Sequence, residues 1–472
     1  MKYILIGLCL WFFQPVLSAQ VLLNQQQCRE MALENSKQMG IARTGRDKAL
    51  YMRKAYRADF FPRLSVSGLG FYNQEKYSYK LKGGYLPTYV PDAEGHLQPN
   101  VVVNPSTGKP VIGPDGTPLF QEYAFLPDIG IRLGMRGVYL AGIQLEQPLY
   151  MGGKIREAHE MAKIGEEVAT VTIRLNRSEV LLETDKAYWQ LVRVQEQVNA
   201  ARAYLKVVGE LLQNLKNAEQ VGMAIRNDVL KVQVRYNEAV LLLQKAENGQ
   251  VLSRMDLCRL VGLSLNTDIR TRDTLPETAM PGIWDLPGSV EGRPDYTLLK
   301  YETDVKNRQI RLTHADYLPQ VGISVGYGYG GGIELNGERD ANASFNAMAS
   351  VKIPLFYWGE GRNKIKAAQA DEEISRLNLE KSVQLMELEI TAARFNITDA
   401  LTRIEMSRNA LKEAAENLRI SRDQYEVGLE TLTNLLEAQA QWQQARSQWV
   451  DAKAELQLSE TRYLKAIGRL GD

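Results

Sequence analysis

Cysteine and histidine are scarce in this chain of 472 residues, which contains three of each. They are widely spaced and form no Cys-x-x-Cys or His-x-x-x-His pair that could hold a metal ion. Metal chemistry and thiol catalysis are therefore close to excluded, and the sequence predicts no cofactor, metal or catalytic residue.

An excess of charge of one sign is also lacking, because 57 Lys and Arg residues stand against 56 Asp and Glu residues. No basic block is interleaved with aromatic residues, so we expect no nucleic-acid partner. After the first twenty residues there is no apolar run of 18 or more, and no helix of the mature chain is expected to cross a bilayer alone. With 44% apolar residues, the chain is expected to fold.

Residues 1–19 have the layout of a secretory signal peptide: Lys2, an apolar stretch over 4–13, and Leu-Ser-Ala before Gln20. A lipoprotein needs a cysteine directly after the small residues, and Cys28 lies eight residues beyond the predicted cut, so we predict no lipid anchor. Export places Cys28 and Cys258 in a compartment where disulfides form, and whether these two pair stays open.

The chain repeats its own plan. Three pairs of segments match: 59–67 with 316–324 at an offset of 257, and 148–153 with 354–359 and 221–222 with 427–428 at an offset of 206. The offsets differ by 51 residues, so the first half carries an insertion. Because residues 73–137 hold eight of the 17 prolines, we predict that this insertion is a long loop.

Apolar residues at alternating spacings of three and four predict long coiled-coil helices in both halves. The seams include Leu191, Val194, Val198, Ala201, Leu205, Val208, Leu212 and Leu215, and Leu435, Ala438, Trp442, Ala445, Trp449, Ala452 and Leu456. We predict helical hairpins over 154–262 and 360–468, turning at Gly222 and Gly428. Helices over 28–58 and 292–315 are expected to stack on the shorter return helices. The predicted organisation is a first repeat over 20–262, a connecting segment over 263–289 and a second repeat over 290–472.

Short segments beside Pro62, Pro148, Pro319 and Pro354 alternate apolar and small or polar residues with period two. Each is about ten residues, the length of a tilted strand crossing a bilayer. A strand pair packing on a soluble core is the alternative, but no other strand-rich segment supplies a second sheet. Four strands cannot close a membrane barrel, so a barrel would be shared between chains, with eight strands from two chains or twelve from three.

These residues resemble the TolC-like outer-membrane efflux channel family over nearly the whole mature chain. The resemblance rests on the doubled layout and on these segments: Phe61-Pro-Arg-Leu64 and Leu318-Pro-Gln320, Pro148-Leu-Tyr-Met-Gly-Gly153 and Pro354-Leu-Phe-Tyr-Trp-Gly359, and the stretch from Tyr425 to Glu437. It implies an α+β membrane protein: a homotrimer with a twelve-stranded barrel in the outer-membrane lipid that continues into a periplasmic tube of twelve helices. It also implies a periplasmic adaptor and, through it, an inner-membrane pump of the RND or ABC type.

The resemblance also implies functional positions at the hairpin tips. Asn434 and Glu437 match the acidic ring that narrows the tube, and with Asn434 neutral the ring should favour cations less strongly. Asp228 and Tyr425 match the contacts that tie the closed tip. Arg226 and Glu430 offer a swapped ion pair, and the turns at Gly222 and Gly428 are where the adaptor would dock.

Two short patterns typical of enzymes occur in one predicted strand, G-x-S-x-G at 322–326 and G-x-G-x-x-G at 326–331. Each requires a strand that turns into a helix, which is not expected there, so we predict no enzyme. The rival interpretation is a periplasmic coiled-coil adaptor or structural protein, which would lack the apolar-faced strands. A second alternative is a channel for protein secretion instead of drug or metal export, and the sequence does not decide between these cargoes.

Overall fold

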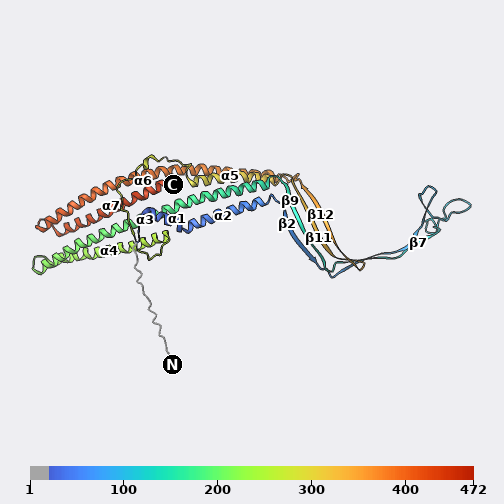
Figure 1. The fold of residues 1–472 in the computed structure, drawn as a ribbon, viewed down its shortest axis with the longest axis horizontal. Helices are drawn as coiled ribbons and strands as arrows, with labels where there is room; N and C mark the ends of the chain where they lie inside the picture. Colours follow the sequence, from blue (N-terminus) through green and yellow to red (C-terminus); the bar gives the residue numbers. More distant parts are fainter. Residues whose placement is uncertain (1–20, 287, 472) are drawn as a thin grey trace, which may run out of the picture. The chain divides into compact units, whose positions relative to one another are not determined.

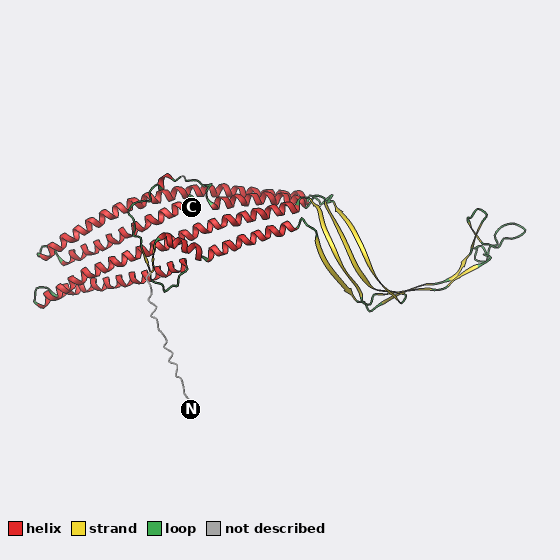
Figure 2. Cartoon of the chain, in the orientation of Figure 1, coloured by secondary structure: helices red, strands yellow, loops and turns green. Residues whose placement is uncertain are grey.

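The computed structural model describes residues 21–286 and 288–471, and its elements carry the labels of Figure 1. The predicted signal peptide over 1–19 lies outside the described residues. The chain divides into two units. The helical unit contains the described residues up to Arg57, Lys154–His314 and those from Trp358 onward, and the strand unit contains Ala58–Gly153 and Ala315–Tyr357. Figure 2 distinguishes the helices in red from the strands in yellow.

The helical unit is built on two long hairpins. The first joins α3 (Lys154–Gln220) to α4 (Arg226–Val261), and the second joins α6 (Glu360–Glu426) to α7 (Leu432–Ala466). Each hairpin packs on itself, and α3 also packs against α7 (Figure 1). The predicted seam residues face these contacts, as Leu191 and Val208 show with no exposed surface. Burial of the heptad positions explains why these stretches are helical.

Shorter elements complete the helical unit. They are β1 (Val21–Leu23), α1 (Gln25–Asn35), α2 (Lys37–Ala58), β10 (Ile269–Thr271), a 3-10 turn at Ile283–Asp285 and α5 (Pro294–Ala315). The single helix expected over 28–58 is wrong, because the backbone of Ser36 is extended and separates α1 from α2. Asn24 starts α1 with a capping box shared with Gln27.

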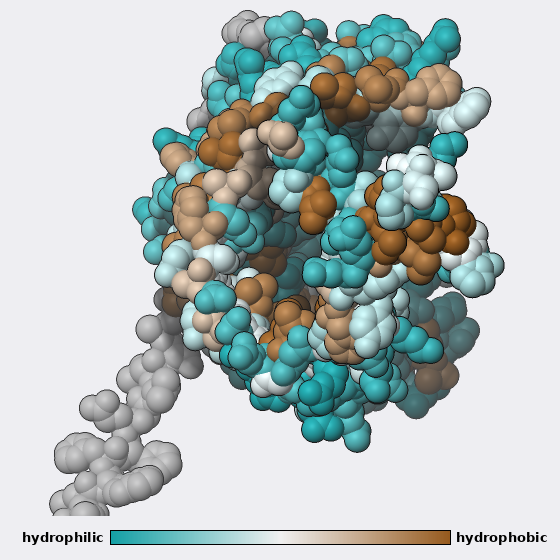
Figure 3. Space-filling view, turned by 90° about the vertical axis from the view of Figure 1, so that its right-hand side faces the viewer, coloured by the Kyte–Doolittle hydropathy of each residue, from teal (hydrophilic) through white to brown (hydrophobic). Residues whose placement is uncertain are grey.

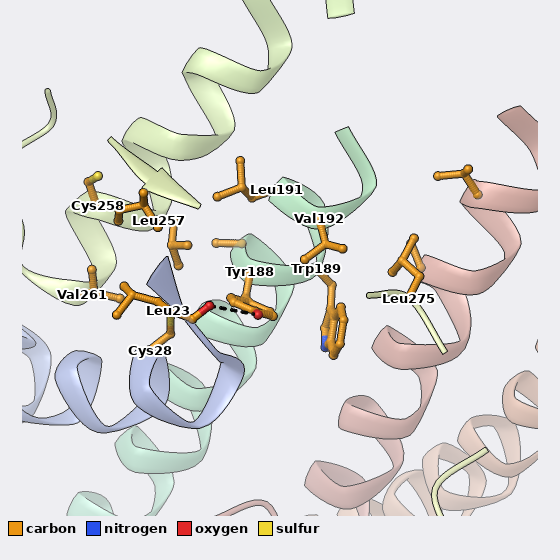
Figure 4. Packing of buried hydrophobic residues seen from close by; sticks show 14 residues of the cluster. Leu23, Cys28, Tyr188, Trp189, Leu191, Val192, Leu257, Cys258, Val261 and Leu275 are labelled. Carbon is orange, nitrogen blue, oxygen red and sulfur yellow. Dashed lines mark hydrogen bonds between the residues drawn. The ribbon is translucent and has the colours of Figure 1, made fainter. Parts of the chain in front are cut away.

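The connecting segment is more ordered than the sequence suggested, because β10 pairs in parallel with β1. Around this pair lies a buried cluster to which α1, α3, α4 and α7 contribute (Figure 4). The hydroxyl of Tyr188 lies 3.3 Å from the backbone oxygen of Leu23, the contact that the dashed line marks in Figure 4. The same hydroxyl donates to Asp273 at 2.7 Å. The mid-part of the helical unit is therefore held together by residues from the beginning, middle and end of the chain.

The two cysteines of the mature chain both lie in this cluster. Cys28 and Cys258 are fully buried, and both are free thiols, so the possible disulfide is not formed. Burial, followed by the negative charges of Asp273 and Asp185, raises the pKa of the Cys28 thiol to about 12. Both residues act as small apolar side chains in the core.

The strand unit contains an antiparallel sheet in the order β2, β9, β11, β12. Its strands are β2 (Arg63–Phe71), β9 (Val138–Met151), β11 (Gln320–Leu335) and β12 (Glu338–Lys352). These are the strands predicted beside the four prolines, although the last is longer than the expected ten residues and ends at Lys352, before Pro354. Within the described residues, β2 pairs only with β9 and β12 only with β11, so both outer edges of this sheet are open.

Asn336 and Gly337 form the two-residue turn between β11 and β12. Both have positive φ, at 52° and 98°, as a type I′ hairpin turn requires. Leu335 pairs with Glu338 directly across this turn. The connection in the second β-hairpin is therefore a tight turn of only two residues.

The insertion of the first half is not the irregular loop that its prolines predicted. It continues the first hairpin as a two-stranded ribbon whose successive pairs are β3 (Lys76–Leu81) with β8 (Ile129–Gly134), β4 (Gly84–Pro87) with β7 (Tyr123–Leu126), and β5 (Tyr89–Pro91) with β6 (Leu97–Pro99). The prolines lie mainly in the distal part, whereas 76–81 and 129–134 contain none and alternate with period two. Proline content over the whole insertion concealed this local alternation.

Candidate functional site

The tip of the first helical hairpin turns at Gly222, as predicted. Its φ is +78°, a left-handed conformation that glycine adopts without strain. The Gly222 N–H donates to the Glu219 carbonyl at 3.0 Å, and the Met223 N–H donates to the Ala218 carbonyl at 2.8 Å. These bonds close the end of α3 and leave apolar side chains exposed at the tip. They are Val221, Met223 and Ile225, at 69%, 84% and 63% exposure.

The tip of the second hairpin has the same construction. Gly428 also has a φ of +78°, its N–H donates to the Tyr425 carbonyl at 3.1 Å, and the Leu429 N–H donates to the Gln424 carbonyl at 2.9 Å. Val427 and Leu429 are 70% and 80% exposed there. Both tips therefore present a glycine turn flanked by apolar side chains that the described chain does not cover.

The two predicted constriction residues lie on an exposed face of α7, one turn apart. Asn434 is in the first turn, where its N–H donates to the Thr431 hydroxyl at 3.2 Å and its side-chain amide donates to Glu430 Oε1 at 2.6 Å. The Glu437 carboxylate accepts a hydrogen bond from Gln441 at 3.3 Å. All these contacts lie within one hairpin, so both polar groups remain available to solvent.

The predicted ion pair between the hairpins is not formed within the chain. Arg226 pairs with Glu219 at 3.3 Å, while Glu430 accepts from Asn434 instead. Asp228 pairs with Lys231 on its own helix at 3.2 Å. A contact between hairpins of neighbouring copies stays a prediction.

Tyr425 lies near enough to Asp228 for the charge of the aspartate to act on its hydroxyl. Tyr425 packs against the cluster that joins the two hairpins near their tips, which includes Val229, Val232, Leu432 and Leu436. Burial of the Tyr425 ring and the nearby charge of Asp228 raise the pKa of the Tyr425 hydroxyl, so the phenol stays protonated at neutral pH. An uncharged hydroxyl beside a carboxylate is suited to donate a hydrogen bond to it.

Polar residues at spacings of four and three form a stripe that leads from the tip along α7: Glu430, Asn434, Glu437, Gln441, Gln444, Gln448, Asp451 and Glu455. This stripe is not uniformly solvated. Asp451, farther along α7, lies against α3, where Gln197 donates to it at 2.9 Å and Arg193 lies at 3.6 Å. Burial raises the pKa of the Asp451 carboxyl, and the charge of Arg193 opposes this shift. The end of the stripe near the tip is therefore the more exposed part.

Sequence reasoning missed an arginine–carboxylate contact in the first repeat, here called the first joint. Asp185 of α3 is fully buried and accepts two hydrogen bonds from Arg29 of α1, at 2.8 and 2.5 Å. Thr461 of α7 donates a third at 3.2 Å. Because Arg29 and Asp185 are 156 residues apart, no local spacing could have revealed the pair.

A second joint occupies the second repeat. Arg293, which is 6% exposed, lies directly before α5 and donates to Asp295 and to Glu389 of α6, both at 2.7 Å. It also donates to the carbonyl of Ala466 at 2.9 Å, at the end of α7. Each joint therefore fastens a short helix to the middle of a long one.

The residues that the structure describes contain neither a cluster of potential metal ligands nor a helix suited to span a membrane. No group of three or more His, Cys, Asp and Glu side chains could hold a metal ion. Among the described helices, none is both long enough and apolar enough to span a membrane.

Long heptad hairpins joined in one chain to an antiparallel sheet with exposed apolar side chains define the class of outer-membrane channel proteins. The family described as outer membrane efflux protein matches residues 131–263 and 290–469, well over half of the chain. The chain belongs to this family, and the resemblance drawn from its sequence is confirmed. It is an outer-membrane channel for efflux or secretion, with a periplasmic tunnel, in a family of channels and not of enzymes.

Individual outer-membrane proteins are similar to this chain in sequence and in fold. The outer membrane protein TolC of Vibrio cholerae is 22% identical over 342 residues, which cover 70% of this chain and 77% of that protein. The alkaline protease secretion protein AprF of Pseudomonas aeruginosa is 24% identical over 348 residues, covering 70% and 68%. The crystal structure of VceC from Vibrio cholerae is similar in fold, with a TM-score of 0.70 at 16% identity, covering 94% of this chain and 96% of that one.

Proposed function

We propose that three copies of this chain form the exit duct of a tripartite efflux or type I secretion system. The observation that carries the proposal is the sheet with two open edges, β2 and β12. Apolar side chains such as Leu64 and Val66 of β2 are 70% and 79% exposed, which suits contact with lipid. Since open strand edges are not tolerated in a bilayer, β2 of one copy would pair with β12 of the next.

Three copies rather than two is what the family resemblance implies. Four strands per copy would then close a twelve-stranded barrel, and four long helices per copy would close a periplasmic tube. A periplasmic adaptor without a channel, the rival interpretation, would not need a sheet with apolar faces and open edges.

The two tips are the proposed docking site for the periplasmic adaptor. Their exposed apolar side chains lie on either side of Gly222 and Gly428. Clustered apolar side chains of this kind mark the contact sites of proteins and form the centres of protein interfaces. Through the adaptor the duct would receive substrate from an inner-membrane pump of the RND or ABC type. The duct is a passive conduit, so the pump selects the cargo.

Asn434 and Glu437 are the proposed constriction. In a trimer, three copies of Glu437 would surround the axis, where carboxylates attract cations. Tyr425 and Asp228 are the residues proposed to tie the closed tip, and the position of Tyr425 near Asp228 supports this assignment.

The oligomer is tested by fractionation and by electrophoresis in mild detergent. We expect the protein in the outer membrane as an oligomer that heating dissociates. A monodisperse monomer that needs no detergent would contradict the proposal.

The constriction is tested by single-channel recording of Glu437→Gln, with Glu455→Gln as a control that removes the same charge farther from the tip. We expect Glu437→Gln to lower cation selectivity and block by multivalent cations, with assembly intact. Equal effects of both variants would place the constriction elsewhere on the stripe.

Co-purification of the adaptor after cross-linking would show which system the duct serves. The name of AprF records protease secretion, whereas the family description records efflux. An adaptor belonging to a protein exporter would therefore assign this chain to secretion.

A further inference from the structure

The ribbon of the insertion has two unlike faces. In the β3–β8 part, residues that pair directly share a face, and every second residue returns to it. One face carries only apolar or aromatic side chains, namely Tyr77, Tyr79, Leu81, Ile129, Ile131 and Leu133. On the other face, Lys76 and Lys80 lie opposite glycines, and Ser78 lies opposite Arg132.

The apolar face of the ribbon is not covered by the described chain. Tyr79 is 67% exposed, and Ile131 is 44% exposed. The space-filling view in Figure 3 shows apolar side chains, in brown, at the surface among polar ones. Six neighbouring apolar residues form a larger exposed patch than scattered surface residues do, and such patches mark contact sites.

The root of the ribbon is fixed to the turn of the second β-hairpin. Glu334 accepts from Lys76 of the ribbon at 2.5 Å and from Arg339 of β12 at 3.2 Å. Asn336 in the turn accepts from the Arg132 N–H through its side chain at 2.8 Å, and its own N–H donates to the Arg132 carbonyl at 2.8 Å. These contacts therefore fix the direction in which the ribbon leaves the sheet.

A two-stranded ribbon is at best marginally stable alone in water, so the apolar face requires a partner. Lipid alone cannot complete the ribbon, because the outer edge of β3 has no strand beside it in the described chain and lipid cannot satisfy its backbone groups. The ribbon continues the strands β2 and β9, of which β2 is an edge that another copy would cover. The nearest available partner is therefore the same ribbon of a neighbouring copy.

We propose that the apolar faces of these ribbons pack against one another in the assembled channel, forming a crown at the outer mouth. This inference rests on the proposed trimer, since rotational symmetry places the same face of each ribbon at the same height around the axis. The basic face then points away from the crown, toward solvent.

Cross-linking between single cysteines tests the crown. Tyr79→Cys places a thiol on the apolar face, and Ser78→Cys places one on the adjacent residue of the basic face. The native Cys28 and Cys258 are buried and give little background. With a short bismaleimide applied to whole cells, we expect Tyr79→Cys to shift to a band of two linked chains, and Ser78→Cys to stay at one.

A third variant separates packing from chance encounter. Ile131→Lys, added to Leu81→Cys, should abolish the cross-link that Leu81→Cys gives alone, while the heat-sensitive oligomer persists. An intact oligomer with no cross-link at either Tyr79 or Leu81, or with equal cross-linking at Ser78, would overturn the crown and leave the proposed channel standing. Loss of the oligomer in unsubstituted protein would overturn both.

Discussion

The first joint and the second joint both fasten a short helix to a long one through an arginine–carboxylate contact, but the buried charge has the opposite sign in each. In the first joint the acid is enclosed, since the side chain of Asp185 is fully buried and that of Arg29 is 25% exposed. In the second the base is enclosed, with the side chain of Arg293 8% exposed and that of Glu389 54% exposed. The cost of losing a partner depends on which charge remains in the interior, so equal chemistry should give unequal stability.

The largest expected effect is from Arg29→Ala. It leaves the Asp185 carboxylate buried with only Thr461 as a side-chain donor, and loss of one partner from a buried pair costs about 3–5 kcal/mol of unfolding free energy. Chemical unfolding followed by the helical circular dichroism signal measures this. The double variant Arg29→Met with Asp185→Leu is the control, and it should recover most of the loss. No recovery would mean that packing of the arginine stem, and not charge, dominates.

Arg293→Ala should cost less, about 2 kcal/mol, near the middle of the range for hydrogen bonds to charged groups. The two carboxylates it leaves are partly exposed and can be hydrated, and only the Ala466 carbonyl loses a donor in the interior. The same unfolding experiment applies, with Arg293→Lys as the matched control that keeps the charge. A loss as large as that of Arg29→Ala would remove the distinction between the joints.

Glu389→Gln should have a smaller effect, below about 1 kcal/mol, as exposed ion pairs usually do. Asp295 still neutralises Arg293 in this variant. The matched control is Asp185→Asn, the same change in the first joint, which we expect to be clearly more destabilising. Similar midpoints for the two variants would contradict the assignment of the buried charge.

The smallest expected effect is a change in pH dependence. Burial alone would raise the pKa of Asp295, but its hydrogen bonds and charge interaction with Arg293 hold that pKa below the usual value. A lowered folded-state pKa contributes stability above the unfolded pKa, near pH 4, and this stability is lost as the pH falls through the folded pKa. Asp295→Asn should therefore flatten the acid side of the stability curve. An unchanged slope would mean that Asp295 is not linked to folding.

The periodic parts of the molecule could be predicted from sequence because their burial repeats locally. Leu191 and Val208 mark a helix whose buried face repeats with the heptad, and alternation marks the strands that follow Pro62 and Pro319. Gly222 and Gly428 could be placed because both lie where a helical seam ends.

What could not be predicted depends on residues that meet only after folding. Arg29 and Asp185 have no local signal, and the pairing of β1 with β10 links three-residue segments far apart in the chain. The ribbon was missed for another reason: Tyr77 and Ile131 alternate visibly with their neighbours, but the prolines around them favoured a loop. At the tips, Arg226 and Glu430 have acceptable partners within their own hairpins, so composition alone could not decide their contacts.

The buried cluster around Tyr188 can be completed only late in the export of the chain. It combines Leu23, the β10 residue Ile269 and, near the end of the chain, Val450 and Ala454 of α7. A chain that crosses the inner membrane from its N-terminus delivers these last two residues only when export is nearly finished. Until then Tyr188 and Trp189 lack part of their cover, so the emerging chain exposes apolar surface throughout most of its export.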